Sequence, residues 1–256
     1  MTRTKKKSLT AAATLFAAAV AFAGLGPMVG AEIAQKDGVR VTIDGTLEPN
    51  KLPRKGTAPV SVSIDSRIST AKKGELPKLE GISIAINSQG RVNNRRVPLC
   101  RLGRIDPSTT AEALAACRSS LIGEGRFTAD VRIPEQSPFP SRGKLLAFNG
   151  RLRGKPAIFA HIYGTKPVPT SYVLPFLLSK TKGTFGTLLR ASLPRVTGEW
   201  GYVTGVSLAL QPRFVSAGCP APAGFKGAVF PLMKTNFGFA GGLRLNTTVV
   251  RGCKVR

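Results

Sequence analysis

The sequence predicts an all-β protein, mainly antiparallel, folded as a two-sheet β-sandwich or a sandwich-like barrel after a cleaved N-terminal signal helix. Three observations support this fold class. The chain of 256 residues begins with a leader typical of export. Most of the remaining sequence alternates apolar and polar residues with a period of two, which is typical of half-buried strands. Turn residues are frequent, with 28 glycines and 19 prolines among the short apolar runs.

The leader has the layout of a secretory signal peptide. A basic stretch, Arg3–Lys7, precedes the apolar run Leu9–Leu25, and Val29-Gly30-Ala31 fits a V-x-A cleavage site. Cleavage after Ala23 is a second option. Retention as a membrane anchor is the alternative, but the run of about 17 residues is rich in Ala and Gly and lies at the lower edge of the spanning range. We therefore expect export through a Sec-type signal at residues 1–31.

Residues 32–256 are expected to form a single secreted β-rich domain with no membrane-spanning segment. The Pro-rich stretch 134–143 is the best candidate for an internal crossover or linker, and it would also allow two small domains. The strands expected at Leu145–Phe148 and Ala157–Ala160 are apolar on both faces. Strands of this kind need cover on both sides, which favours one shared core.

Individual strands are identified by their apolar stripes. In the longest stripe, the alternation places Tyr202, Thr204, Val206, Leu208 and Leu210 on one core-facing side. Clusters such as Asn149-Gly150 are expected to be turns between strands. The stripes are Val39–Ile43, Val60–Ile64, Ile82–Ile86, Phe127–Ile133, Tyr202–Leu210 and Leu243–Leu245.

One segment breaks the strand pattern and predicts a short α-helix near residues 109–121. Thr109 and Glu112 have the spacing of a capping box, and the Ala-rich sequence that follows favours a helix. The helix would carry Cys117 on its inner face, so that a bond to Cys100 would attach it to the sheet.

The four cysteines are Cys100, Cys117, Cys219 and Cys253. An even number in an exported chain predicts two disulfides, for which three connectivities exist. Proximity in the sequence favours pairing the first with the second and the third with the fourth. There is no C-x-x-C motif and only one histidine, so neither a metal site nor a cofactor is expected.

Catalytic motifs are scarce. The single histidine, His161, is expected on the Phe159/Tyr163 face of a strand, half-buried and hydrogen-bonded to a neighbour. No nucleophile elbow, P-loop or dinucleotide fingerprint occurs. The weak catalytic candidate is Glu199, a carboxylate beside Trp200 that could serve a carbohydrate-active hydrolase together with a second carboxylate.

The charge is strongly positive. Removing the leader, which holds four basic residues and no acidic one, would lower the net charge from +25 to about +21. Such a charge attracts anionic envelope polymers or an anionic lipid surface, although it also fits dispersed solvated charge. Nucleic acid is disfavoured but stays open, because only three Tyr and one Trp could stack on bases. The candidate anion-binding residues are Arg91, Arg95, Arg96, Arg101, Arg104, Arg142, Lys144, Arg151, Arg153 and Lys155.

A last feature is the unusually apolar stretch Ser171–Leu178, which either lines a pocket for an apolar ligand or forms a core strand that bends at Pro175. The sequence thus favours a non-enzymatic binding or structural protein of the cell envelope or extracellular space. The alternatives are an envelope hydrolase using Glu199 and a carrier of an apolar ligand. The sequence does not define the ligand or the oligomeric state.

Overall fold

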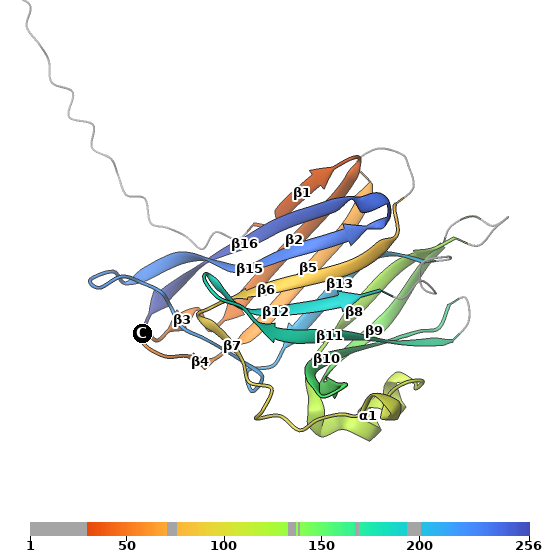
Figure 1. Cartoon of the computed structure of the whole chain (residues 1–256), viewed down its shortest axis with the longest axis horizontal. Helices are drawn as coiled ribbons and strands as arrows, with labels where there is room; N and C mark the ends of the chain where they lie inside the picture. Colours follow the sequence, from red (N-terminus) through yellow and green to blue (C-terminus); the bar gives the residue numbers. More distant parts are fainter. Residues whose placement is uncertain (1–29, 71–75, 133–136, 138, 167–168, 194–200) are drawn as a thin grey trace, which may run out of the picture.

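In the computed structural model, the described residues are 30–70, 76–132, 137, 139–166, 169–193 and 201–256, and most of them belong to one large curled sheet (Figure 1). A second, small sheet lies at one end of the large one. All strand pairs but one are antiparallel within the two sheets, the exception being β16 with β3. The mainly antiparallel all-β prediction is therefore confirmed.

The elements of the first half are β1 (Glu32–Lys36), β2 (Val39–Glu48), β3 (Lys51–Leu52), β4 (Ala58–Pro59), β5 (Ser61–Thr70), β6 (Leu79–Asn87), β7 (Gly90–Val92), η1 (Leu102–Arg104), α1 (Thr110–Cys117), η2 (Arg118–Ser120) and β8 (Leu121–Val131). Those of the second half are β9 (Phe139–Leu152), β10 (Lys155–Gly164), β11 (Thr170–Lys180), β12 (Phe185–Ser192), β13 (Gly201–Leu210), β14 (Val215–Ala217), β15 (Gly227–Phe239), η4 (Ala240–Gly242) and β16 (Arg244–Val255).

The two halves of the chain interleave in the large sheet. Its strand order is β1-β2-β5-β13-β8-β9-β10-β11-β12-β6-β15-β16-β3, so β13 lies between β5 and β8 while β6 lies between β12 and β15. The segment 134–143, expected as a crossover or linker, has residues 139–143 in β9, where Phe139 is paired with Val131 of β8. Residues 134–136 and 138 of this segment lie outside the described residues.

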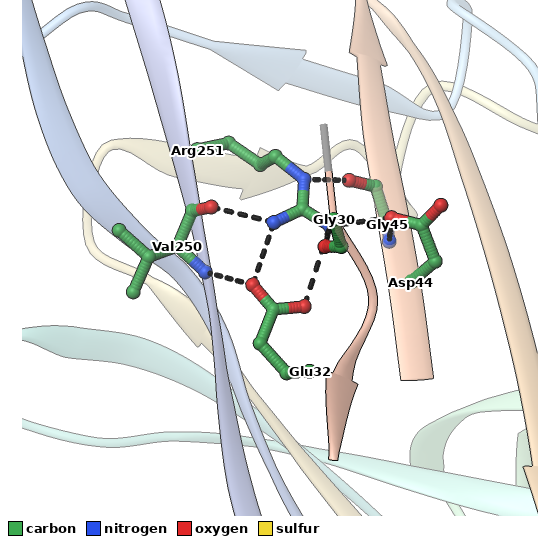
Figure 2. A network of polar contacts seen from close by, with 6 residues as sticks. All are labelled: Gly30, Glu32, Asp44, Gly45, Val250 and Arg251. Carbon is green, nitrogen blue, oxygen red and sulfur yellow. Dashed lines mark hydrogen bonds and ion pairs between the residues drawn. The ribbon is translucent and has the colours of Figure 1, made fainter. Parts of the chain in front are cut away.

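Side chains join β1, at one end of this sheet, to β16, which is the strand before the other end (Figure 2). The guanidinium of Arg251 on β16 forms ion pairs with Glu32 of β1, at 2.6 Å, and with Asp44 of β2. The same Glu32 carboxylate accepts a hydrogen bond from the backbone N–H of Val250 at 3.0 Å. The curled sheet is thus closed between β1 and β16 by a charged cluster, which we call the seam.

Backbone carbonyls satisfy the remaining donors of Arg251. Its Nε donates to Gly45 at 2.6 Å, and its terminal nitrogens donate to Val250 at 2.6 Å and to Gly30 at 3.0 Å. Burial by itself would lower the pKa of Arg251, but the hydrogen bonds and negative charges of Glu32 and Asp44 outweigh it, so that the pKa is raised. The guanidinium therefore stays charged within the seam.

The apolar stripes face the inside of the curl. Phe127, Ala129 and Val131 line an interior cavity, as the alternation predicted, and so do the three isoleucines of β6. The stripe in β13 is correct only from Val206 onward. The register between β13 and β8 shifts between Val203 and Gly205, and this bulge reverses the faces of the residues before it.

The predicted inward position of Tyr202 and Thr204 is therefore wrong. Gly201 and Val203 face the cavity at this end of β13. The ring of Tyr202 instead lies 4.9 Å from the guanidinium of Arg132, and Thr204 donates to the hydroxyl of Thr128 at 3.2 Å.

Helix α1 covers the outer face of β9 and β10. Thr109 caps it, and the reciprocal bonds between Thr109 and Glu112 form the predicted capping box. The hydrogen bonds from Thr109 hold the pKa of the Glu112 carboxyl below its usual value. A disulfide between Cys100 and Cys117 holds the helix on the sheet. Because the helix covers one face and the cavity adjoins the other, β9 and β10 are apolar on both sides.

The expected turn at Asn149-Gly150 is wrong, since both residues lie inside β9. The buried amide of Asn149 donates to the carbonyls of Asn94 and Val97, at 2.9 and 2.7 Å, and so holds the preceding loop on the strand. A Cβ at Gly150 would come within 2.3 Å of the Phe159 ring. The turn is formed instead by Arg153-Gly154, where both φ angles are positive, at 49° and 77°.

The small sheet, β4-β14-β7, closes one end of the curl. Val60 donates to the carbonyl of Val215 at 3.1 Å, which connects the small sheet to the chain leading into β5. A second disulfide, Cys219–Cys253, ties the segment after β14 to β16. Both disulfides that sequence proximity favoured are therefore present, and they indicate an oxidising, extracytoplasmic environment.

Candidate functional site

The most prominent feature of the interior is a cavity of about 580 Å³ within the curl of the large sheet. Its wall is built from inward-facing residues of β2, β5, β6, β8 to β13 and β15. These residues are overwhelmingly Ile, Leu, Val, Phe and Ala. The volume falls within the range of about 300–1,000 Å³ that is typical of small-molecule sites.

The two ends of the cavity differ in chemistry. At one end, the small sheet contributes apolar residues such as Val92, Val215 and Ala217, the last two of which are buried. At the other end, where β10 and β11 are connected, the lining includes Ser141, Lys166 and Thr170. Lys166 is exposed to solvent, so we call this end the mouth and the small-sheet end the floor.

Lys166 is the single charged residue among those that line the cavity in the described part of the chain. Its backbone is fixed by the buried Ser141, whose hydroxyl donates to the Lys166 carbonyl at 2.9 Å. Sequence reasoning missed this residue, because Lys166 stands in a Thr-Lys-Pro cluster that indicates only a turn. No local pattern shows that the turn borders an apolar cavity.

The apolar stretch of β11 contributes to this site. Tyr172, Val173, Leu174 and Phe176 line the cavity, while Leu177 packs against the outer cluster below α1. Among the described residues, the pairs between β11 and β12 run from Leu177 to Lys180. Pro175 lies outside this run of pairs, and such a position tolerates a residue without an N–H group.

His161 lies on the opposite face of β10, below α1, and is fully buried rather than half-buried as expected. Its Nε2 is 3.0 Å from the backbone carbonyl and 3.1 Å from the hydroxyl of Ser108. The hydroxyl of Ser108 donates to the carbonyl of Ile105 at 2.8 Å. The imidazole is therefore the donor, and its Nδ1 has no partner among the described residues.

Through these hydrogen bonds, His161 connects β10 to the loop before α1. Desolvation lowers the pKa of His161, and the Ser108 carbonyl and the charge of Asp106 oppose this shift only in part. The ring is thus neutral near pH 7. A hydrolytic base needs a carboxylate at the nitrogen facing away from the serine, whereas the Nδ1 of His161 lacks such a partner among the described residues.

The predicted anion-binding residues fall into two groups. The first group belongs to segments near the floor end of β9 and the loop that Asn149 holds. Its members are Arg91, Arg95, Arg96, Arg101, Arg104, Arg151, Arg153 and Lys155. Arg142 and Lys144 lie at the mouth end. Arg142 and Arg151 are nine positions apart on one strand, which corresponds to about 30 Å. The two groups therefore do not share one rim.

Arg101 and Arg104 line a second, smaller hollow of about 280 Å³ beside the Cys100–Cys117 disulfide. Ser119 and Ser120 contribute to the same hollow. Lys144 instead forms an exposed ion pair with Glu124 at 2.9 Å.

Some predicted features lie outside the described residues. These include Glu199, its neighbour Trp200, and residues 1–29 of the leader. Within the described ranges, no helix combines the length and the apolarity needed to cross a membrane.

Comparisons with known proteins give little to add to this geometry. No known protein family matches the chain, and no curated protein matches it. Among solved structures, one similar chain is described by the words "AvmM Catalyzes Macrocyclization in Alchivemycin A Biosynthesis". The alignment covers 86% of this chain and 95% of that chain, with 9% identity and a TM-score of 0.24. A likeness this distant carries no argument about fold or function.

Proposed function

We propose that the protein is an exported carrier that holds an apolar small molecule inside the curled sheet. The observation that carries the proposal is the cavity of about 580 Å³ with its almost wholly apolar wall. Cavities of this composition take up apolar compounds, because water gains few hydrogen bonds inside them.

The size of the cavity supports an occupied state. Leucine-to-alanine series relate destabilisation to residual cavity volume with a slope of about 24 cal/mol per Å³. Extending this slope to 580 Å³ gives an upper bound of about 14 kcal/mol for an empty, dry cavity. This cost is as large as the whole free energy of unfolding of an ordinary domain, about 5–15 kcal/mol. A bound ligand would remove much of it.

The lining also favours binding over chemistry. Besides apolar groups, the described wall holds hydroxyls, one amide and the amine of Lys166, with no carboxylate or imidazole beside them. General acid–base catalysis needs titratable groups placed at the reacting atoms. We therefore assign a carrier role to the site.

Native mass spectrometry of the purified, oxidised protein tests the proposal by looking for a co-purifying apolar compound. Titration with a neutral fluorescent dye, N-phenyl-1-naphthylamine, provides a second measurement. We expect saturable binding of one dye molecule per chain. Neither a bound compound nor saturable dye binding would refute the proposal.

A pair of variants shows whether the dye binds in the cavity. Ala160 lines the cavity, whereas Ala209 is exposed on β13 between the lining residues Leu208 and Leu210. Ala160→Phe fills the cavity and should weaken dye binding at least tenfold, while Ala209→Phe adds the same ring outside and should leave binding unchanged. Equal effects of both variants would place the dye elsewhere.

Binding to anionic envelope material is a second candidate function, supported by the hollow that Arg101 and Arg104 line. Counter-charged contacts of this kind weaken as salt screens them. The test is binding of the protein to its own cell-wall fraction across a salt series, with the double variant Arg101→Gln/Arg104→Gln for comparison. Binding that is insensitive to salt and to this variant would reject the candidate.

A further inference from the structure

We propose that the hollow beside the Cys100–Cys117 disulfide binds a doubly charged phosphate group, either as the free ion or as a phosphate monoester. This hollow, which we call the arginine hollow, has a volume of about 280 Å³ and is lined by Arg101, Arg104, Ser119 and Ser120 together with the disulfide. The inference deepens the second candidate function and rests on its claim that this hollow binds anions.

The two arginines belong to one short turn. The backbone N–H of Arg104 donates to the carbonyl of Arg101 at 3.0 Å, which closes the 3-10 turn of η1. Residues three positions apart in such a turn lie on the same side of it, so both side chains reach the arginine hollow. Cys100 and Ile105 are buried on either side of the turn and fix its backbone.

The two serines are held beside this turn by the disulfide. Ser119 and Ser120 belong to η2, which directly follows Cys117, and the bond from Cys117 to Cys100 brings this segment next to the turn. Ser120 is 2% exposed and lines the arginine hollow, and its hydroxyl bonds to no described residue. Since polar groups in so buried a residue are normally hydrogen-bonded, an oxyanion in the hollow would supply the partner.

Both guanidiniums lack an acidic partner among the described residues. Neither Arg101 nor Arg104 forms an ion pair or a side-chain hydrogen bond there. Asp106, two positions from Arg104, is exposed and forms no ion pair with it, and the carboxylate of Glu112 accepts from the backbone N–H of Thr109 at 2.8 Å. The arginine hollow therefore presents two positive charges to a ligand.

The acidic residues outside the described ranges are too far along the chain to neutralise these charges. They are Glu75, Glu135 and Glu199. Each is at most five positions from a described strand end that lies level with Val131 in the sheet, and five residues span at most roughly 18 Å. Val131 is ten positions from Leu121 along β8, or about 33 Å, and the arginine hollow lies at the Leu121 end.

The charge and the donors of the arginine hollow favour a phosphate over a carboxylate. A carboxylate would neutralise one guanidinium, whereas a phosphate monoester carries a charge of about −1.5 to −2 at pH 7 and three acceptor oxygens. The planar fork of each arginine can bind two of these oxygens, and the serine hydroxyls add further donors. The volume is several times the ~30 Å³ of one water molecule in the liquid, which leaves room for an organic substituent.

Two further cations border the site. Arg118 precedes Ser119 and is exposed, and the guanidinium of Arg213 donates to the carbonyl of Leu121, directly after Ser120. Their field would attract anions toward the arginine hollow and would be screened by salt. The affinity should therefore fall as the salt concentration rises.

Calorimetric titration of the purified, oxidised protein at pH 7.5 compares glycerol 3-phosphate, inorganic phosphate and glycerate, which carries a carboxylate on the same three-carbon frame. We expect one phosphate to bind per chain, about tenfold more tightly than glycerate, as one additional charged hydrogen bond would provide. At pH 5 this ratio should shrink, because a phosphate monoester loses its second charge at about pH 6 while both arginines stay charged. The rank of the two phosphates separates an ester from the free ion as the ligand.

Four variants locate the binding. Arg104→Gln should weaken phosphate binding at least tenfold, and Arg104→Lys, which keeps the charge but not the planar fork, should lose part of the affinity. Ser120→Ala should weaken binding about threefold and leave the melting temperature unchanged, because its hydroxyl has no described partner. Arg96, exposed in the loop before the arginine hollow, is the matched control, and Arg96→Gln should leave binding unchanged.

Two results would overturn the inference even if the protein binds its cell-wall fraction. One is equal affinity for glycerol 3-phosphate and glycerate at pH 7.5, and the other is phosphate binding that persists in Arg104→Gln. Absence of salt-sensitive binding to the wall fraction, with the phosphate preference intact, would instead refute only the envelope function.

Discussion

Replacing Arg251 by methionine should test whether the seam stabilises the curled sheet. Methionine keeps much of the volume of the side chain but removes every hydrogen bond of the guanidinium. The side chain of Arg251 is 10% exposed, and those of Glu32 and Asp44 are 23% and 36% exposed. Removing one partner of a buried ion pair costs about 3–5 kcal/mol, because the other charge stays buried.

The partial exposure of both carboxylates reduces this cost. Water can solvate Asp44 and, to a smaller degree, Glu32 once the guanidinium is gone, so we expect the lower end of the range, about 3 kcal/mol. Glu32→Gln removes the charge of one partner. In the double variant Glu32→Gln/Arg251→Met, the two losses should fall short of additivity by about 1–2 kcal/mol, because both changes break the same contacts.

Urea unfolding of the oxidised protein, followed by circular dichroism, provides these free energies. Arg244, an exposed residue of the same strand, is the matched control, and Arg244→Met should stay within about 0.5 kcal/mol of the wild type. A loss below 0.5 kcal/mol for Arg251→Met, or strict additivity with Glu32→Gln, would refute the role of the seam.

Four further predictions concern other parts of the fold. The unfolded chain protonates His161 at its usual pKa near 6.5 while the folded pKa is lower, so the unfolding free energy should fall as pH drops below about 6.5, by at most about 1.4 kcal/mol per pH unit. His161→Gln should remove this slope in urea titrations from pH 7 to 5.5, and a slope that persists would contradict the assignment. Replacing the Cys219–Cys253 pair by serines, with a sequence separation of 34, should cost about 4 kcal/mol, against about 3 for Cys100–Cys117, with a separation of 17, in the same assay. Gly150→Ala should lower the melting temperature by several degrees, because its Cβ meets the Phe159 ring, and an unchanged value would show that the ring can move. In a series of alkyl ligands, each added methylene should raise the affinity for the protein about fourfold until the cavity is full. An affinity that does not change with chain length would show that the alkyl chain lies outside the cavity.

Local features of the fold could be predicted from the sequence. The stripe Phe127–Val131 faces the cavity because alternation along a regular strand is a property of the backbone itself. Helix α1 begins at its capping box because Thr109 and Glu112 satisfy each other three positions apart. The disulfides formed between the cysteines nearest in sequence.

Features that depend on distant parts of the chain could not be predicted. A bulge in β13 moved Tyr202 outward, and no residue pattern there shows the extra position. The partners of Arg251 lie 207 and 219 positions away, so the sequence shows only an isolated charge in a strand. The cavity exists because the side chains of ten strands do not fill the space their curl encloses, which is a property of the whole sheet. Its charged residue, Lys166, is visible only once that space is known.

The seam also determines when the fold can be completed. Glu32 and Arg251 are separated by 219 residues, so the sheet cannot close until strands from both extremes of the described chain have met. Closing so long a loop costs conformational entropy before the contacts between its ends can offset that cost. Folds dominated by such long-range pairings therefore form slowly. Until then, the apolar side of the unfinished sheet stays open to other chains. A newly synthesised molecule would therefore pass its most aggregation-prone period before Arg251 reaches Glu32, and protection by a chaperone would matter most in that interval.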